Sequence, residues 1–280
     1  MKGGSLSGRF NGWQTCVALA LFFGSRLWAQ VVLLPDPGPQ LTFAGQDRKV
    51  TLWWRNSGEK DIELNLHGRL NQASSATTVP IGDFPWKQLR ILAGQTVIES
   101  ATISFPGVKA ETRFLVQWVT ETDKVVGTTD VFVYPNDILK ELKTLAGDEP
   151  VGIFDSDNRL KPLLKELSVE FSDLEDSGIA SFGGRLAIVD AFSQKATMPE
   201  DLAQRIKTAA GKGPGVVWLQ QPGKRSNKLR PSFYTVATGK GTIVVAQANL
   251  VTKLADDPQA QLNLVQLCRL AVRPEPLLSK

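Results

Sequence analysis

The sequence is poor in residues that bind metals or act as nucleophiles. Of its 280 residues, two are cysteine and one is histidine. Cys16 lies near the amino terminus, so Cys268 alone is left if that end is removed, and no intramolecular disulfide can then form. His67 falls among predicted strands, and the second half of the chain has no histidine. Ser-His-Asp and Cys-His catalysis are therefore excluded there, as are zinc sites built on histidine pairs or CxxC motifs.

Three further absences narrow the function. No Gly-x-Gly-x-x-Gly or Walker-type loop follows a predicted strand, so nucleotide binding of the usual kinds is not predicted, nor is any cofactor. No run after residue 29 is long and apolar enough to cross a bilayer. The net charge of +4 comes mainly from Lys2, Arg9 and Arg26, without which 29 basic residues stand against 28 acidic ones. A nucleic-acid partner therefore has no electrostatic support.

Residues 1–29 have the three parts of a secretory signal peptide. Lys2 and Arg9 provide the basic start, residues 16–23 are apolar, and Leu27-Trp28-Ala29 precedes a cleavage point after Ala29. The apolar run is short for a membrane span, and retention as an anchor is the alternative. We expect an exported protein, periplasmic or extracellular.

Residues 30–135 are predicted to form an immunoglobulin-like β-sandwich. Short runs rich in Val, Ile, Thr, Phe and Trp are separated by Gly, Asn, Asp and Pro. Residues 62–66 alternate apolar and polar side chains, as a half-buried strand does. Roughly seven such strands in about 100 residues fit a sandwich of this class.

The pattern changes to a helical period in residues 136–148, which we predict to be a linker helix. Residues 149–280 then alternate strand-like and helical segments, with near-continuous apolar runs at 151–154, 186–189 and 242–246. This alternation predicts an α/β domain with a doubly wound, mostly parallel sheet of the flavodoxin-like kind.

The segment Phe154-Asp155-Ser156-Asp157-Asn158 is the one catalytic candidate. An apolar strand followed by Asp-x-Asp resembles the first motif of haloacid-dehalogenase-type phosphotransferases. That resemblance implies a Mg²⁺-dependent phosphohydrolase in which Asp155 is the nucleophile and Asp157 the acid/base. The alternative is a turn in which Asp157 or Asn158 caps the helix that starts near Leu160.

Candidate binding residues lie in two other places. Trp53 and Trp54 are neighbours on a predicted strand and must face opposite sides, one in the core and one free to stack on a sugar or contact another part of the protein. Lys224 and Arg225 lie in a basic loop that is either solvated or an anion-binding edge. Arg159, just after the Asp-x-Asp segment, is the remaining candidate binding residue.

The order of elements resembles a known arrangement. The segments on which this resemblance rests are 131–135, 138–140, 151–155, 215–220, 239–245 and 254–260. Together they resemble the C-terminal region of some secreted bacterial glycoside hydrolases, in which an immunoglobulin-like module precedes a class I glutamine-amidotransferase-like domain. The family's Gly-x-Cys-x-Gly nucleophile elbow is absent, and Gln220-Gln221-Pro222-Gly223 stands after the corresponding strand.

These observations favour an exported accessory, binding or scaffolding protein without catalytic machinery of its own. The resemblance suggests carbohydrate or another envelope protein as the partner. A divergent phosphohydrolase using Asp155 and Asp157 is the alternative, and a structural cell-envelope protein is a third class.

We expect the protein recovered from a secreting host to begin at Gln30, because the basic start, apolar run and cleavage point occur in the required order. Intact-mass measurement of the exported product tests this. A full-length product found in the cytoplasm would contradict it.

Overall fold

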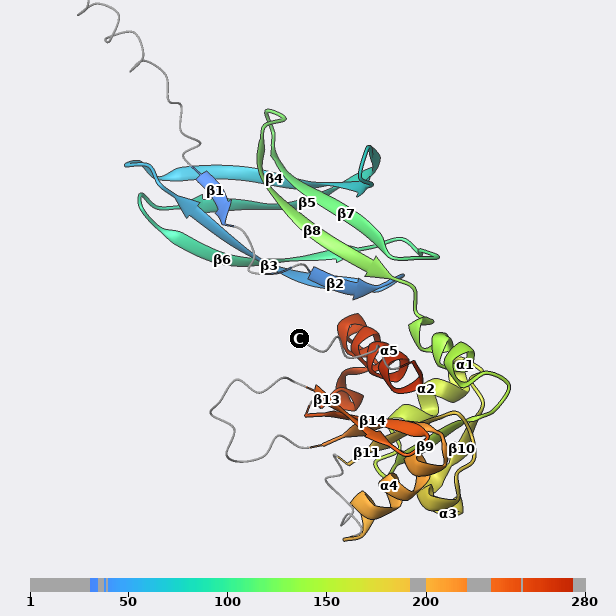
Figure 1. Cartoon of the computed structure of the whole chain (residues 1–280). Coiled ribbons are helices and arrows are strands. Elements are labelled where there is room, and N and C mark those ends of the chain that lie inside the picture. The colour runs from blue at the N-terminus through green and yellow to red at the C-terminus, as the bar shows by residue number, and fades with distance from the viewer. Residues whose placement is uncertain are drawn as a thin grey trace, which may run out of the picture.

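The computed structural model describes residues 31–34, 38, 40–191, 200–220, 233–247 and 249–273. Within these residues the chain is mostly β-structure, arranged as three sheets with helices around one of them (Figure 1). The first eight strands are β1 (Val31–Leu34), β2 (Gln40–Phe43), β3 (Asp47–Asn56), β4 (Ile62–Ala73), β5 (Thr78–Ile91), β6 (Thr96–Ser104), β7 (Thr112–Thr120) and β8 (Val125–Tyr134).

Strands β1 to β8 form two sheets, compatible with a β-sandwich, that share one hydrophobic core. Their orders are β1-β3-β6 and β2-β8-β7-β4-β5. Along β3 every second side chain is buried, because one face of a strand points inward and the other to solvent. Trp54 and Trp118 are fully buried and meet edge to face, with ring centroids 6.3 Å apart. The Trp118 indole N–H donates to Thr129 Oγ1, so its polar atom is satisfied inside the core.

The amino-terminal strands join both sheets. β1 pairs antiparallel with β3, whereas β2 pairs in parallel with β8. β1 also lies against β8 where Gly127 faces Leu33, and a Cβ at position 127 would overlap the Leu33 side chain. Glycine is thus required there for the close approach of the two strands.

The third sheet has six strands in the order β10-β9-β11-β12-β14-β13. The first five are parallel to their neighbours and β13 is antiparallel to β14. The strands are β9 (Val151–Asp155), β10 (Phe171–Asp173), β11 (Leu186–Asp190), β12 (Gly215–Leu219), β13 (Phe233–Thr238) and β14 (Gly241–Ala246). The helices are η1 (Ile138–Lys140), α1 (Glu141–Ala146), α2 (Leu160–Glu166), α3 (Leu174–Ser177), η2 (Ile179–Ser181), α4 (Leu202–Lys212), η3 (Val251–Lys253) and α5 (Pro258–Val272).

Helices cover both faces of this sheet, which therefore has two cores. On one face Ile188 of β11 packs in a cluster with α1, α2 and α5, and on the other Val189 packs with α3 and α4. Both faces of the central strands are buried, as expected for a parallel sheet. The helix α5 also lies against β2 of the first half of the chain (Figure 1).

The segment between β8 and β9 holds both halves together. Asn136 donates a hydrogen bond from Nδ2 to the carbonyl of Ala44 at 3.2 Å. Glu141 of the same segment accepts two hydrogen bonds from Arg269 of α5. The Nε and Nη2 groups of Arg269 donate to the two carboxylate oxygens, each at 2.6 Å. This two-point pair fixes α1 against α5.

The structure agrees with the coarse prediction of a β-rich first part followed by a mostly parallel sheet with helices, and it corrects details. The predicted 136–148 helix consists of two shorter elements, η1 and α1, and ends at Ala146. Cys268 is buried in α5, and burial raises the pKa of its thiol, as for an inert cysteine. Among the described residues, no helix is long and apolar enough to span a membrane.

Candidate functional site

Three neighbouring strands of the six-stranded sheet end in an acidic residue. β9 ends in Asp155, β10 in Asp173 and β11 in Asp190. Because the strands are parallel, these ends lie along one edge of the sheet, where ligands bind in open α/β folds. Asp155 and Asp190 are directly paired in register and both are buried.

Asp155 is fully enclosed and anchors helix α2. Its Oδ2 accepts hydrogen bonds from the backbone N–H groups of Leu160, at 2.6 Å, and Lys161, at 3.2 Å. Its Oδ1 is buried and has no hydrogen-bond partner in the described part of the chain. Between Asp155 and Leu160, Asn158 adopts a left-handed φ of 53° and donates its N–H to the Asp155 carbonyl at 2.9 Å. A carboxylate at a helix start satisfies free N–H groups and faces the positive end of the helix dipole.

The prediction that Asp157 or Asn158 caps this helix is therefore wrong. The capping carboxylate comes from the last residue of the strand, five positions before Leu160. The sequence pattern missed this because capping is ordinarily assigned to the residue next to the helix, and a tight turn brings Asp155 there instead. Asp157 has a side chain that is only 4% exposed and forms an ion pair with Arg159, Oδ2 to Nη2, at 3.3 Å.

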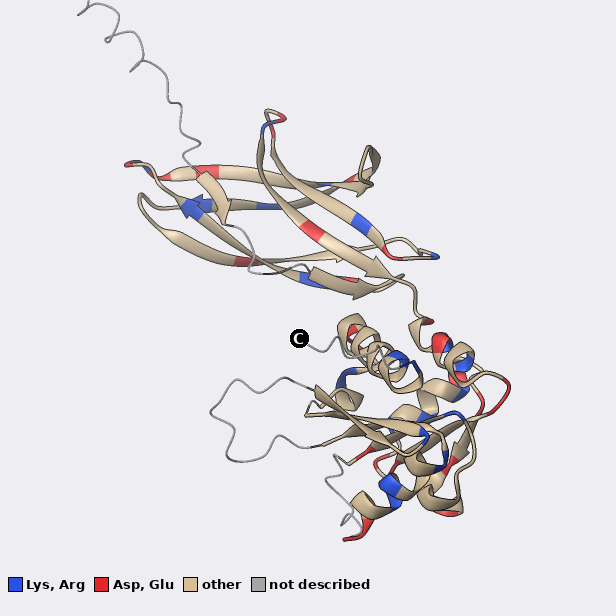
Figure 2. Cartoon of the chain, viewed as in Figure 1, with Lys and Arg blue, Asp and Glu red and all other residues tan. Residues whose placement is uncertain are grey.

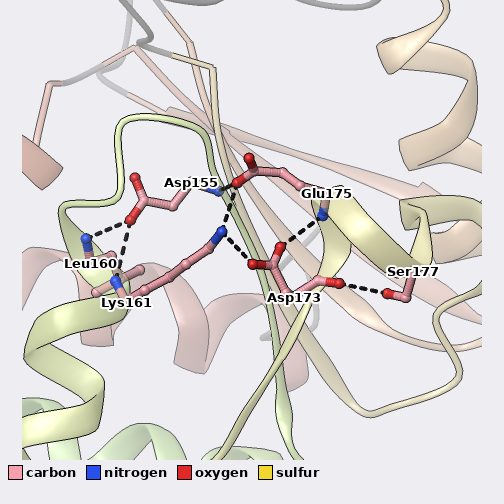
Figure 3. Close-up of polar contacts among 6 residues, drawn as sticks. All are labelled: Asp155, Leu160, Lys161, Asp173, Glu175 and Ser177. Atoms are coloured by element: carbon pink, nitrogen blue, oxygen red, sulfur yellow. Dashed lines mark hydrogen bonds and ion pairs between the residues drawn. The ribbon is translucent and has the colours of Figure 1, made fainter.

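A second set of polar contacts surrounds Lys161 in the first turn of α2 (Figure 3). Its Nζ lies 2.6 Å from Asp173 Oδ2 and 2.8 Å from Glu175 Oε1. Glu175 Oε1 also accepts the backbone N–H of Asp155 at 2.9 Å. The lysine thus ties α2 to the end of β10 and the start of α3.

The charges of this network stabilise one another. Burial alone would lower the pKa of Lys161, but its hydrogen bonds to Asp173 and Glu175 outweigh burial and raise that pKa above 10.5. Burial would likewise raise the pKa of Asp173, yet the hydrogen bonds from Lys161 and from the Glu175 N–H lower it below 3.8. Asp173 also caps α3 by accepting that N–H at 3.0 Å.

This geometry does not fit the magnesium site of the phosphohydrolase hypothesis. That site needs Asp155 and Asp157 to face one opening, with carboxylate oxygens free for the metal and the phosphate. Asp155 is enclosed and has one oxygen on the α2 N–H groups, and Asp157 is paired with Arg159. In the described residues no group of three or more His, Cys, Asp or Glu side chains could hold a metal ion.

The two neighbouring tryptophans face opposite sides of β3, as predicted. Trp54 is in the core, and Trp53 is 45% exposed on the outer face of the β1-β3-β6 sheet. Trp86, on β5 of the other sheet, is half-buried against Trp54 and Trp118. Among the described residues Trp53 is therefore the one exposed tryptophan, and there is no row of them. The candidates Lys224 and Arg225 lie outside the described residues.

Sequence reasoning missed Lys161 and Glu175. Lysine in the first turn of an amphipathic helix is usually solvated, and the partners of Lys161 are more than ten positions away in the chain. The signal was the acidic pair Asp173 and Glu175, at the end of β10 and the start of α3, which Figure 3 places beside the lysine.

Comparisons with known proteins leave the chain without a family. No family model and no curated protein matches it. Among solved structures, it is similar to an alkylpurine DNA glycosylase from Pseudomonas fluorescens, with a TM-score of 0.30, 11% identity, and 38% of this chain and 30% of that chain covered. It is also similar to a β-glucosidase from Listeria innocua, with a TM-score of 0.29, 13% identity, and 37% of this chain and 16% of that chain covered. A Niemann-Pick type C2 protein from the Japanese carpenter ant has a TM-score of 0.27 and 11% identity, with 38% of this chain and 88% of that chain covered. The chain spans under a third of the first two, and TM-scores this low carry no argument.

We expect Asp155→Ala to lower the free energy of unfolding by about 1–2 kcal/mol, because two helix N–H groups lose their acceptor. Chemical denaturation measures this. Asp256→Ala, an exposed aspartate before α5, is the control and should change stability by about 0.5 kcal/mol or less. Magnesium-dependent phosphate-ester hydrolysis by the wild type, abolished in Asp155→Asn, would reverse the assignment.

Removing the Lys161 ammonium should destabilise the protein in a pH-dependent way. Because the folded pKa of Asp173 lies below 3.8, the stability from this pair is complete above that pH and is lost as the pH falls through the folded pKa. Lys161→Met should therefore cost about 1–2 kcal/mol at neutral pH, since the carboxylates are partly exposed, and much less in acid.

Denaturation curves of Lys161→Met and of the wild type across pH 2–7 test this expectation. Lys165→Met, the same change at an exposed position of α2, is the control and should leave the pH profile of the wild type unaltered. An equal cost for Lys161→Met at every pH would mean that packing, and not charge, is the contribution of this side chain.

Proposed function

We propose that this chain is an exported accessory protein without catalysis of its own, whose first half binds carbohydrate through the outer face of β3 and β6. The observation that carries the proposal is the exposed indole of Trp53 on that face. The accessory role agrees with the state of the Asp-x-Asp segment, whose carboxylates are engaged within the protein.

The outer face has the composition that a sugar requires. Trp53 is paired in register with Ile98, which is 56% exposed, and the two form an apolar centre. The exposed positions nearest to them on the same face carry hydroxyl and cationic groups: Lys49, Thr51, Arg55, Thr96, Ser100 and Thr102. A pyranose ring presents C–H groups on its faces and hydroxyls at its rim, so its face packs on an indole while its rim meets hydrogen-bonding side chains.

The proposed architecture is an immunoglobulin-like module followed by a flavodoxin-like or amidotransferase-like domain. Support for the first comes from β1 and β2, which are consecutive but pair with opposite sheets around one core. Support for the second is the parallel order β10-β9-β11-β12-β14, which is the flavodoxin-like order, with β13 added antiparallel. Gln220 follows β12 where the amidotransferase family has its nucleophile elbow, in keeping with a non-catalytic role.

Trp53→Ala should weaken binding to an insoluble polysaccharide by about tenfold or more, equivalent to about 1.4 kcal/mol, while the melting temperature stays near that of the wild type. Pull-down isotherms on cellulose, chitin, β-glucan and peptidoglycan measure this. Val125→Ala, which shortens an exposed apolar side chain on β8, is the control and should bind like the wild type. A wild type that binds none of these polymers, or a Trp53→Ala variant that binds equally, would contradict the proposal.

A further inference from the structure

Within the described part of the chain, strand β13 is an unprotected edge of the six-stranded sheet. Among the described residues it pairs only with β14, and it lies at the margin of the sheet in Figure 1. Five of its six residues are exposed, so both of its faces are open, and Phe233, Tyr234 and Val236 are 40%, 47% and 37% exposed. No residue of this strand is charged (Figure 2). An exposed apolar edge offers a template to which another strand adds.

The opposite edge of the same sheet shows how such an edge is usually protected. β10 is only three residues long and ends in Asp173, whose carboxylate is held by Lys161. A short edge with a charge at its end offers little for another strand to pair with.

The edges of the other two sheets are protected as well. β1 and β2 have four residues each, and β5 carries two prolines, several charges and two register shifts against β4. β6 has Glu99 paired with Lys87, and the Trp86 indole donates to its Ser100 carbonyl. β13 has none of these features: it is six residues long and pairs with β14 without a register shift.

The hairpin fixes which backbone groups of β13 are free. β13 and β14 join through the two-residue turn Gly239-Lys240, in which Gly239 has a φ of 58°. In such a hairpin the closing pair, Thr238 and Gly241, exchanges both hydrogen bonds, and bonded pairs then recur at every second residue. Val236 and Tyr234 therefore bond to β14, while Phe233, Thr235 and Ala237 direct their N–H and C=O groups away from the sheet.

We propose that β13 pairs antiparallel with β13 of a second copy of this chain, joining two six-stranded sheets across a twofold axis. The axis must run perpendicular to the sheet, which keeps each face of the strand on the same side in both copies. Residues opposite one another then share a face, which allows a register centred on Thr235. In this register Phe233 lies opposite Ala237 of the partner on one face, and Tyr234 lies opposite Val236 on the other.

The side chains favour a second copy over a charged peptide as the occupant. In this register each face joins a large side chain to a smaller one, so the same strand complements itself. Because the strand is uncharged, two copies meet without repulsion between like charges, and a charged peptide would find no countercharge on it. The twofold axis pairs the β13 edge of each copy with that of the other. No β13 edge is then left free, so the assembly stops at a dimer.

Sedimentation velocity and light scattering over a wide concentration series test this proposal on the full chain. The wild type should have twice the molar mass of one chain. Thr235→Pro should reduce the mass by half, because it removes an outward N–H that the partner needs but no hydrogen bond within the hairpin. Val236→Lys should do the same by placing like charges near the axis.

Circular dichroism and melting temperature show whether each variant is folded, and if Thr235→Pro does not fold, Val236→Lys decides. Val125→Lys is the control, since it makes the same substitution at another exposed valine, on β8, and should leave the dimer intact. A wild type that is monomeric at every concentration would overturn the proposal. So would a dimer that persists in the folded variants, or a wild type that forms open-ended oligomers.

Discussion

The bond between the Asp155 carboxylate and the start of α2 is the contact on which the sheet edge depends. It sets the angle at which α2 leaves β9, because two backbone N–H groups of the helix must reach one oxygen at the end of the strand. That angle in turn directs Lys161 toward the end of β10 and the start of α3. The place where open α/β sheets commonly bind ligands is thus occupied by the protein's own charges.

Much of the fold could be predicted from the sequence because its signals are local. Buried parallel strands are continuous apolar runs, and β9, β11 and β14 were recognised on that basis. β13 was not recognised, since its short run Phe-Tyr-Thr-Val adjoins a polar basic stretch that favours a loop. The change of sheet between β1 and β2 also has no local signal, because it depends on partners far along the chain.

The candidate site was predicted in place but not in function. The strand end at Asp155 was identified correctly, because an apolar run followed by polar residues and a helical pattern marks such an end. The role of each carboxylate was not identifiable, since it depends on the direction of a side chain after a tight turn. The left-handed backbone of Asn158 reverses the chain there and brings the α2 N–H groups to Asp155. Only three-dimensional geometry separates a capping aspartate from a reactive one.

The parallel pairing of β2 with β8 determines when the first half of the chain can finish folding. Gln40 pairs with Val131, so β2, near the amino terminus, forms its ladder only with the last strand of the two-sheet unit. In a chain made or translocated from its amino terminus, β2 emerges early and has no partner until β8 follows. Such non-local pairing slows folding and leaves edges open to aggregation while it is incomplete. The brevity of β1 and β2, four residues each, limits that exposure during synthesis.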